Sequence, residues 1–183
     1  MGATTTQGTG AGAADNIKAT IKNGTINTAN IVSNAVHVEK IDRAPVKVTS
    51  STLTVTESLH ANKVVNLSRA AGIAVTLPKA HGLGDKYTFM LDTTITSNTT
   101  TIKVEGGSGD LMAGRSIASS DNGTTTNNVW LTQSNTNTIT LNGGTTSGYV
   151  GDTIEITDLA EGLWVVNCFL KETGTEATPF SHS

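Results

Sequence analysis

The most regular hydrophobic pattern in the chain lies between residues 21 and 46, where an aliphatic side chain stands at every fifth position. The six positions are Ile21, Ile26, Ile31, Val36, Ile41 and Val46. This period matches neither the 3.6-residue turn of a helix nor the two-residue alternation of a strand. It is typical of short extended segments interrupted by turns, because Asn23-Gly24 and Ser33-Asn34 supply turn-forming pairs at equivalent places in a ten-residue unit.

A series with one aliphatic position in five is too sparse to build a hydrophobic core within one chain. The backbone of such a segment loses conformational freedom on folding, and sparse side chains return too little burial to offset that loss. Sister copies can supply the opposing side chains and the missing backbone hydrogen-bond partners. The repeat therefore predicts a short homo-oligomeric stem over residues 17–46, expected to be threefold; the alternative is an irregular loop with scattered isoleucines. The residues expected to pack in the trimer are Ile21, Ile26, Ile31, Val36 and Ile41.

From residue 44 onward the pattern changes to short segments in which apolar and polar residues alternate, as in half-buried β-strands. Clusters of Gly, Asn, Ser and Asp separate these segments. The predicted strands are 46–48, 53–55, 62–67, 71–77, 86–91, 100–105, 111–118, 128–132, 137–142, 152–157 and 163–170. The last segment is apolar at successive positions, so it predicts a central strand that is covered on both faces.

The composition favours the same fold class. Thr, Ser, Asn and Gly make up 81 of the 183 residues, and such a chain forms helices poorly and strands fairly well. We expect an all-β protein with a compact β-sandwich or jelly-roll-like domain over residues 47–183, a barrel being the alternative. The short trimeric β stem precedes this domain. An extended N-terminal arm over residues 1–16 comes first, and its low-complexity sequence predicts order only against a partner.

The net charge, the length of the apolar runs and the number of cysteines exclude several classes of function. The net charge of −3 argues against nucleic-acid binding by bulk charge. No apolar run approaches the ~18 residues of a membrane span, and residues 1–14 lack the basic and apolar parts of a signal peptide. The single cysteine, Cys168, cannot form an intramolecular disulfide. We therefore expect a protein made in the cytoplasm, with no membrane partner and no covalent cross-link.

Two parts of the sequence resemble virion proteins of tailed bacteriophages. The segment IKNGTINTANIVSNAVHVEKI, over residues 21–41, resembles the NGTI and GAV…KI repeats of trimeric phage fibre and head-fibre proteins. Within residues 71–181, the chain resembles small β-domain proteins on tailed-phage heads. The matching segments are YTFMLDTTITSNTTTIKV, DLMAG, NTITLNG, GDTIEITDLAEGLWVVNCFL and GTEATPFS.

This resemblance implies a non-enzymatic structural protein of the virion surface, of the capsid-decoration (cement) or head-fibre kind. It implies a homotrimer that binds the major capsid protein and stabilises the shell without a cofactor. The capsid contacts are expected in the arm, at Thr4, Thr5, Thr6, Gln7 and Asn16. The reverse polarity, with the β-domain on the shell, stays open.

A second hypothesis is a tail-fibre or spike component that binds a host glycan. Such a protein needs exposed aromatic or acidic residues at its tip. The aromatic candidates are Trp130, Trp164 and Tyr149, of which Trp164 is expected in the core. A third hypothesis, a glycan-degrading enzyme, would require two catalytic carboxylates. Asp152, Glu155 and Asp158 are the candidates, and we interpret them instead as exposed charges at a strand edge.

Other side chains with chemical potential also have structural interpretations. The four histidines lack the spacing of a metal site and are expected on the surface or in loops. They are His37, His60, His81 and His182. Cys168 is expected to be a small buried hydrophobe rather than a nucleophile. The run Gly106–Leu111 resembles a calcium-binding GGxGxD unit, but its Asp arrives one position early and the unit does not repeat. The sequence therefore predicts no metal and no catalytic residue.

Overall fold

The computed structural model describes residues 44–120 and 127–183, which belong to a unit spanning Arg43–Ser183. The residues predicted to pack in a trimer and those predicted to contact a capsid all lie outside the described residues. They are Ile21, Ile26, Ile31, Val36 and Ile41 for the trimer, and Thr4, Thr5, Thr6, Gln7 and Asn16 for the capsid.

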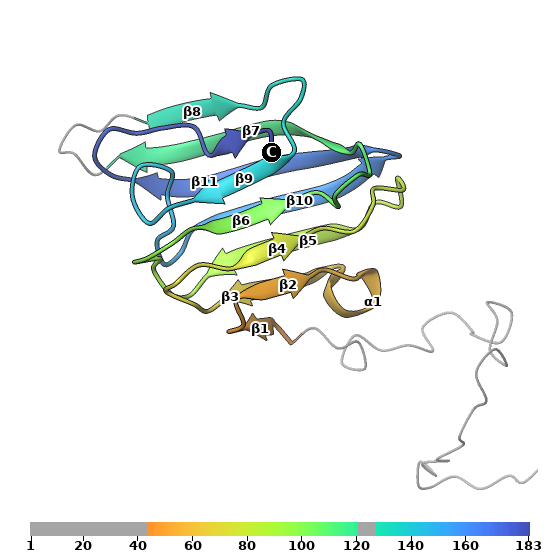
Figure 1. Ribbon diagram of the computed structural model, residues 1–183, viewed down its shortest axis with the longest axis horizontal. Helices are drawn as coiled ribbons and strands as arrows, with labels where there is room; N and C mark the ends of the chain where they lie inside the picture. Colours follow the sequence, from red (N-terminus) through yellow and green to blue (C-terminus); the bar gives the residue numbers. More distant parts are fainter. Residues whose placement is uncertain (1–43, 121–126) are drawn as a thin grey trace, which may run out of the picture. The chain divides into compact units, whose positions relative to one another are not determined.

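The described residues form twelve strands and one four-residue helix (Figure 1), so the expectation of a mostly β chain is confirmed. The elements are β1 (Val46–Val48), β2 (Thr52–Thr54), α1 (Glu57–His60), β3 (Lys63–Leu67), β4 (Ala74–Thr76), β5 (Lys86–Leu91), β6 (Thr100–Lys103), β7 (Leu111–Ser120), β8 (Asn127–Leu131), β9 (Thr138–Leu141), β10 (Thr153–Ala160), β11 (Leu163–Glu172) and β12 (Phe180–Ser181). Each of the eleven predicted segments overlaps one strand, whereas α1 and β12 were not predicted.

The strands form two mixed sheets. The large sheet has the order β1-β3-β5-β10-β11-β7-β8, and the small sheet has the order β12-β9-β6-β4-β2. From β1 to β6 the chain passes from one sheet to the other at every step, so each strand lies parallel to the strand two before it. The chain therefore winds around its own core, and later strands add antiparallel pairs such as β10 with β11.

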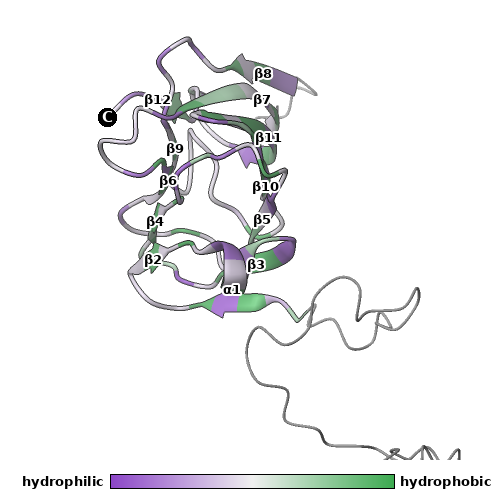
Figure 2. Ribbon diagram, turned by 90° about the vertical axis from the view of Figure 1, so that its right-hand side faces the viewer, coloured by the Kyte–Doolittle hydropathy of each residue, from purple (hydrophilic) through white to green (hydrophobic). Residues whose placement is uncertain are grey.

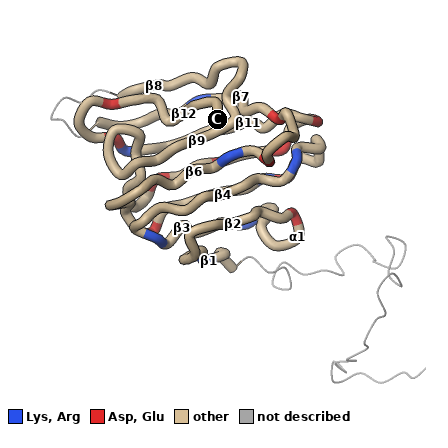
Figure 3. Tube along the Cα trace, viewed as in Figure 1, with Lys and Arg blue, Asp and Glu red and all other residues tan. Residues whose placement is uncertain are grey.

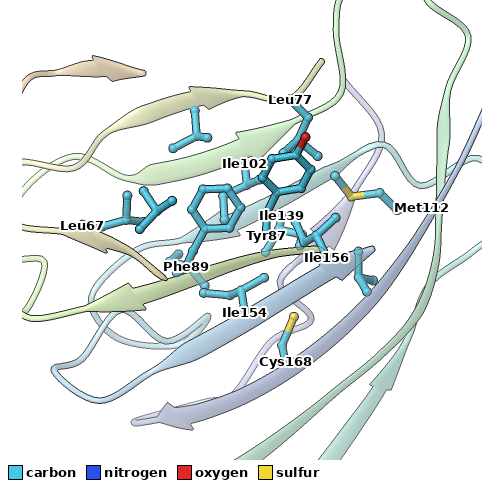
Figure 4. Close-up of a cluster of buried hydrophobic side chains, with 14 of the residues drawn as sticks. Leu67, Leu77, Tyr87, Phe89, Ile102, Met112, Ile139, Ile154, Ile156 and Cys168 are labelled. Carbon is cyan, nitrogen blue, oxygen red and sulfur yellow. The ribbon is translucent and has the colours of Figure 1, made fainter. Parts of the chain in front are cut away.

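The core lies between the two sheets, which form two layers in side view (Figure 2). The strand registers align one line of inward side chains across each sheet. Across the large sheet the line is Val46, Val65, Phe89, Ile154 and Cys168. Across the small sheet it is Leu53, Val75, Ile102, Ile139 and Phe180. Figure 4 shows Phe89, Ile154, Ile102 and Ile139 converging with Tyr87, whose ring packs edge-on against Trp164 at a centroid distance of 5.9 Å.

The prediction that the strand within 163–170 is covered on both faces is wrong. β11 is central in the large sheet, but its side chains alternate between the core and the outside. Trp164, Val166 and Cys168 point into the core, while Phe169 is 56% exposed on the opposite face. The reason is that, within residues 44–120 and 127–183, no layer packs on the outer face of this sheet. The apolar residues at successive positions therefore mark an exposed apolar surface.

Candidate interaction surface

The outer face of the large sheet carries a cluster of exposed apolar side chains. Register pairing places Phe169 of β11, Ile117 of β7 and Val129 of β8 side by side. Leu131 lies two residues beyond Val129 on the same face, and Val150 borders the same groove as Phe169. We call these five residues the apolar outer surface. They are between 40% and 67% exposed, and an exposed patch of this kind usually marks a contact site.

A shallow groove of about 440 Å³ runs along this surface. Ile117, Phe169 and Val150 provide its apolar lining, and Asn127 and Lys171 provide polar groups at its border. The Lys171 ammonium also lies 5.0 Å from the centre of the Tyr149 ring, within the range of a cation–π contact. The groove can therefore accept an apolar group whose polar attachment faces the border.

The outer face of the small sheet has a different character. It presents threonines from four neighbouring strands, and they are Thr52, Thr54, Thr76, Thr101 and Thr140. Lys103 is the only charged residue within these strands, and Figure 3 shows how few charges this face carries. The two outer faces are therefore chemically distinct, one rich in hydroxyl groups and one rich in exposed apolar groups.

The interpretation of Asp152 and Asp158 as exposed strand-edge charges is wrong, since each is only 3% exposed. The Asp158 carboxylate accepts hydrogen bonds from the backbone N–H groups of His81, Gly82 and Leu83, at 2.7–3.1 Å. It therefore fixes the loop between β4 and β5. Glu155 alone lies partly exposed on the outer face, where it pairs with Lys86 at 2.9 Å.

Asp152 holds a second loop in the same way. Its carboxylate accepts hydrogen bonds from the N–H groups of Gly148 and Tyr149, and one from the N–H group of Lys171 at 2.8 Å. Burial raises the pKa of Asp152, and the three backbone donors oppose that rise. Both aspartates are occupied with backbone donors, so their geometry is that of loop anchors rather than of a catalytic pair.

Glu172, which the sequence did not single out, is a fully buried acid at the end of β11. Its carboxylate accepts hydrogen bonds from Trp130 Nε1, at 3.1 Å, and from Asn128 Nδ2. Burial raises the pKa of Glu172, the two donors lower it, and Glu176 and Asp152 raise it further by repulsion. The net direction is upward, because removal from water disfavours the charged form.

We expect Glu172→Gln to change the pH dependence of stability. A carboxyl group with a raised pKa in the folded state favours folding less as pH rises from its unfolded pKa to its folded pKa. The free energy of unfolding of the Gln variant should therefore increase relative to that of the wild type between pH 4 and pH 7. Urea unfolding at several pH values measures this. Glu105→Gln, at an exposed acid, is the control, and equal pH slopes for the wild type and Glu172→Gln would contradict the prediction.

The other chemical candidates are also accounted for by packing. His37 lies outside the described residues, His81 and His182 are exposed, and His60 is buried, so the surface prediction is wrong for His60. The ring of His60 turns inward because its Nδ1 accepts the Thr56 N–H at 3.0 Å. Cys168 is buried as predicted, and burial raises the pKa of its thiol to about 12.

The acidic residue of the glycine-rich run 106–110 is buried and forms a hydrogen bond within the domain. Asp110 is 1% exposed, and its Oδ2 accepts the N–H of Ala80 at 2.7 Å. This bond holds the loop that follows β4. Among the described residues, no group of three or more His, Cys, Asp or Glu side chains is placed to hold a metal ion. The same part of the chain contains no helix long and apolar enough to cross a membrane.

The three aromatic residues considered for glycan binding do not form a common platform. Trp164 is in the core at 1% exposure, as expected. Trp130 is partly buried and donates a hydrogen bond to the carboxylate of Glu172. The hydroxyl groups of Tyr149 and Thr173 share a hydrogen bond at 3.0 Å. The exposed aromatic side chain is instead Phe169. The sequence signal for Phe169 is the run of apolar residues at consecutive positions in 163–170, which places apolar side chains on both faces of the strand.

Comparison with known proteins adds no relative to this picture. No protein-family model matches the chain, and no match is found among curated proteins or solved structures.

Proposed function

We propose that the chain is a structural protein of a tailed-phage virion, which decorates the capsid surface as a homotrimer bound to the major capsid protein. In this proposal the two-sheet domain is a sandwich-like head. The extended arm over residues 1–16 anchors it, and the short stem over residues 17–46 joins three copies. The protein acts by adhesion and stabilises the shell, without catalysis or a cofactor.

The observation that carries this proposal is the five-residue aliphatic repeat between Ile21 and Val46, which is too sparse to form a core in one chain. The last position, Val46, lies in β1 and packs against the core of the domain, so the positions assigned to the stem packing are the five from Ile21 to Ile41. The apolar outer surface adds support, because a second surface suited to protein contact is expected in a protein that works in an assembled layer.

Adhesion by three linked copies explains how weak single-chain contacts can give stable decoration. Once one arm is bound, the other two bind at high effective concentration, which raises the overall affinity without new contacts. A layer that binds only the assembled shell then stabilises it by mass action. The arm gains backbone hydrogen bonds when it becomes ordered against the shell, which its own composition cannot provide.

Deletion of residues 1–16 tests the anchor. We expect the shortened chain to remain a folded trimer but to bind purified capsids about 100-fold more weakly or not at all, because the linked contacts of the three arms with the capsid are lost. Co-sedimentation with capsids measures binding, and light scattering measures the mass of the free protein. Retained binding would exclude the arm as the anchor and favour the reverse polarity.

The number of copies per virion tests the proposal as a whole. Decoration predicts hundreds of copies on each particle, which quantitative mass spectrometry of purified virions can count. A few dozen copies or fewer would favour the second candidate, a tail-fibre or spike component that binds a host glycan. The observation in favour of that candidate is the exposed ring of Phe169 beside a groove bordered by Asn127 and Lys171.

A further inference from the structure

Strand β8 is an edge strand that lacks the usual protection against pairing. Edge strands are commonly kept apart from other strands by charges, proline or very short length. At the opposite edge of the large sheet, β1 follows Pro45 and carries the exposed Lys47. In the small sheet, the edge strands β2 and β12 have three and two residues. β8 has five residues, NNVWL, with no charge and no proline.

The free side of β8 has backbone groups ready to pair. The Thr132 N–H donates to the Gly114 carbonyl at 3.1 Å, which fixes the alternation of the β7–β8 ladder. In an antiparallel ladder every second residue turns its N–H and C=O away from the partner strand. In β8 these residues are Asn127, Val129 and Leu131. Within the described part of the chain, no strand pairs with that side.

We infer that a second copy of this chain pairs with β8 through its own β8, antiparallel and centred on Val129. In this register Val129 faces Val129 of the second copy, and Asn127 faces Leu131. The two large sheets then continue through the junction. The row Phe169, Ile117, Val129 on one copy meets the same row on the other, because all three residues share one register line on the outer face.

The side chains next to the junction suit a like partner. Val129 is 59% exposed and Leu131 is 67% exposed, and pairing covers both from the side. β8 has no charged residue, so self-pairing places no like charges opposite each other, which would be unfavourable across strands. Among the described residues of this face, the charge next to β8 in the register is Arg115, which is paired with Leu131 of its own copy. Beyond Leu131, Arg115 would meet the neutral Asn127 of the second copy.

The size of the contact sets its expected strength. A five-residue ladder with its flanking side chains lies at the low end of interface sizes, below about 1,200 Å² of total buried area, where association is weak or transient. We therefore expect a dissociation constant in the micromolar range for this junction alone. The contact is separate from the proposed stem, so in an assembled layer it would link neighbouring trimers.

Val129→Lys in the full chain tests the junction. The position is exposed, so a lysine fits the folded domain, but self-pairing would place two ammonium groups face to face. Analytical ultracentrifugation across a concentration series should show that the variant loses the concentration-dependent doubling of mass shown by the wild type. Thr52→Lys, at an exposed position in edge strand β2, is the matched control and should behave as the wild type.

The masses also separate this inference from the proposed trimer. With a trimeric stem, the wild type should change between three and six copies, and Val129→Lys should stay at three. Without such a stem, the change is between one and two copies, and the variant stays at one. A wild type that never doubles its mass, or a variant that doubles it equally, overturns the junction.

Cysteine cross-linking fixes the register and does not depend on the lysine variant. Facing residues of an antiparallel pair lie about 4.5–5.5 Å apart at their Cα atoms, within reach of a disulfide. Val129→Cys should cross-link to itself under mild oxidation, while Asn127→Cys and Leu131→Cys should cross-link when mixed but only weakly alone. The buried Cys168 does not compete. If Val129→Lys blocks assembly or capsid binding but Val129→Cys forms no self-disulfide, β8 pairs with a different segment or partner and the inference is wrong.

Discussion

Replacing Gly114 with alanine is expected to lower the free energy of unfolding by about 3 kcal/mol, the upper end of the usual range for overpacking. Gly114 lies in β7 opposite Val166 of β11, and a Cβ built on it would overlap the Val166 carbonyl oxygen. The obstacle is the backbone of an adjacent interior strand of the large sheet, so neither strand can move without breaking its ladder. Urea unfolding followed by circular dichroism measures the loss, and low expression as a soluble protein is a further expected sign.

Gly107→Ala is the control that separates steric overlap from backbone strain. Gly107 has a φ of +80°, but a Cβ there meets no atom within 4 Å. Its substitution should therefore lose only the roughly 1–2 kcal/mol associated with left-handed backbone. Equal losses at positions 107 and 114 would show that the close approach of β7 and β11 is not what requires glycine.

Replacing Trp164 with alanine is expected to lower the free energy of unfolding by about 3–5 kcal/mol, the usual range for a large buried aromatic residue. Trp164 is 1% exposed and packs edge-on against the ring of Tyr87, so its removal opens a cavity between the two sheets. Differential scanning calorimetry and urea unfolding both measure the change.

Trp164→Phe is the informative companion variant. The indole Nε1 is buried and finds no hydrogen-bond partner among the described residues, a condition that itself disfavours the folded state. Phenylalanine removes this unpaired donor and keeps most of the ring contact. We expect a loss well below that of Trp164→Ala, and a loss as large would mean that the indole nitrogen has a partner, such as a bound water molecule.

The positions of the strands could be predicted because burial on one face leaves a two-residue period in the sequence. β5, with Tyr87, Phe89 and Leu91 inward, is a clear case. The sheet order could not be predicted in the same way. Alternation shows which side chains of a strand point inward, but it does not show which of two sheets the strand joins. The parallel pairs of β1 to β6 arise because each connecting loop passes from one sheet to the other, and loop residues have no periodic pattern that would reveal this.

It was harder to predict from the sequence which polar side chains are buried and which apolar side chains are exposed. Asp158 and Asp152 are buried because loop N–H groups surround them, and backbone donors are the same whatever the sequence of the loop. Phe169 has the opposite difficulty, since an apolar residue on an outer face has the same sequence signature as one in a core. The apolar outer surface could be recognised only after the structure showed which face of β11 lacks a covering layer.

The winding of the first six strands has a mechanical consequence for a chain that is held through its N-terminal side. β1 and β2 are the end strands of the large and small sheets, and each is joined to the rest through only three register pairs. A pulling force applied at residue 44 would act on β1 and β2 before it acts on any other strand. We therefore expect the strands to detach one after another from that end, and the long ladder between β7 and β11 to break last.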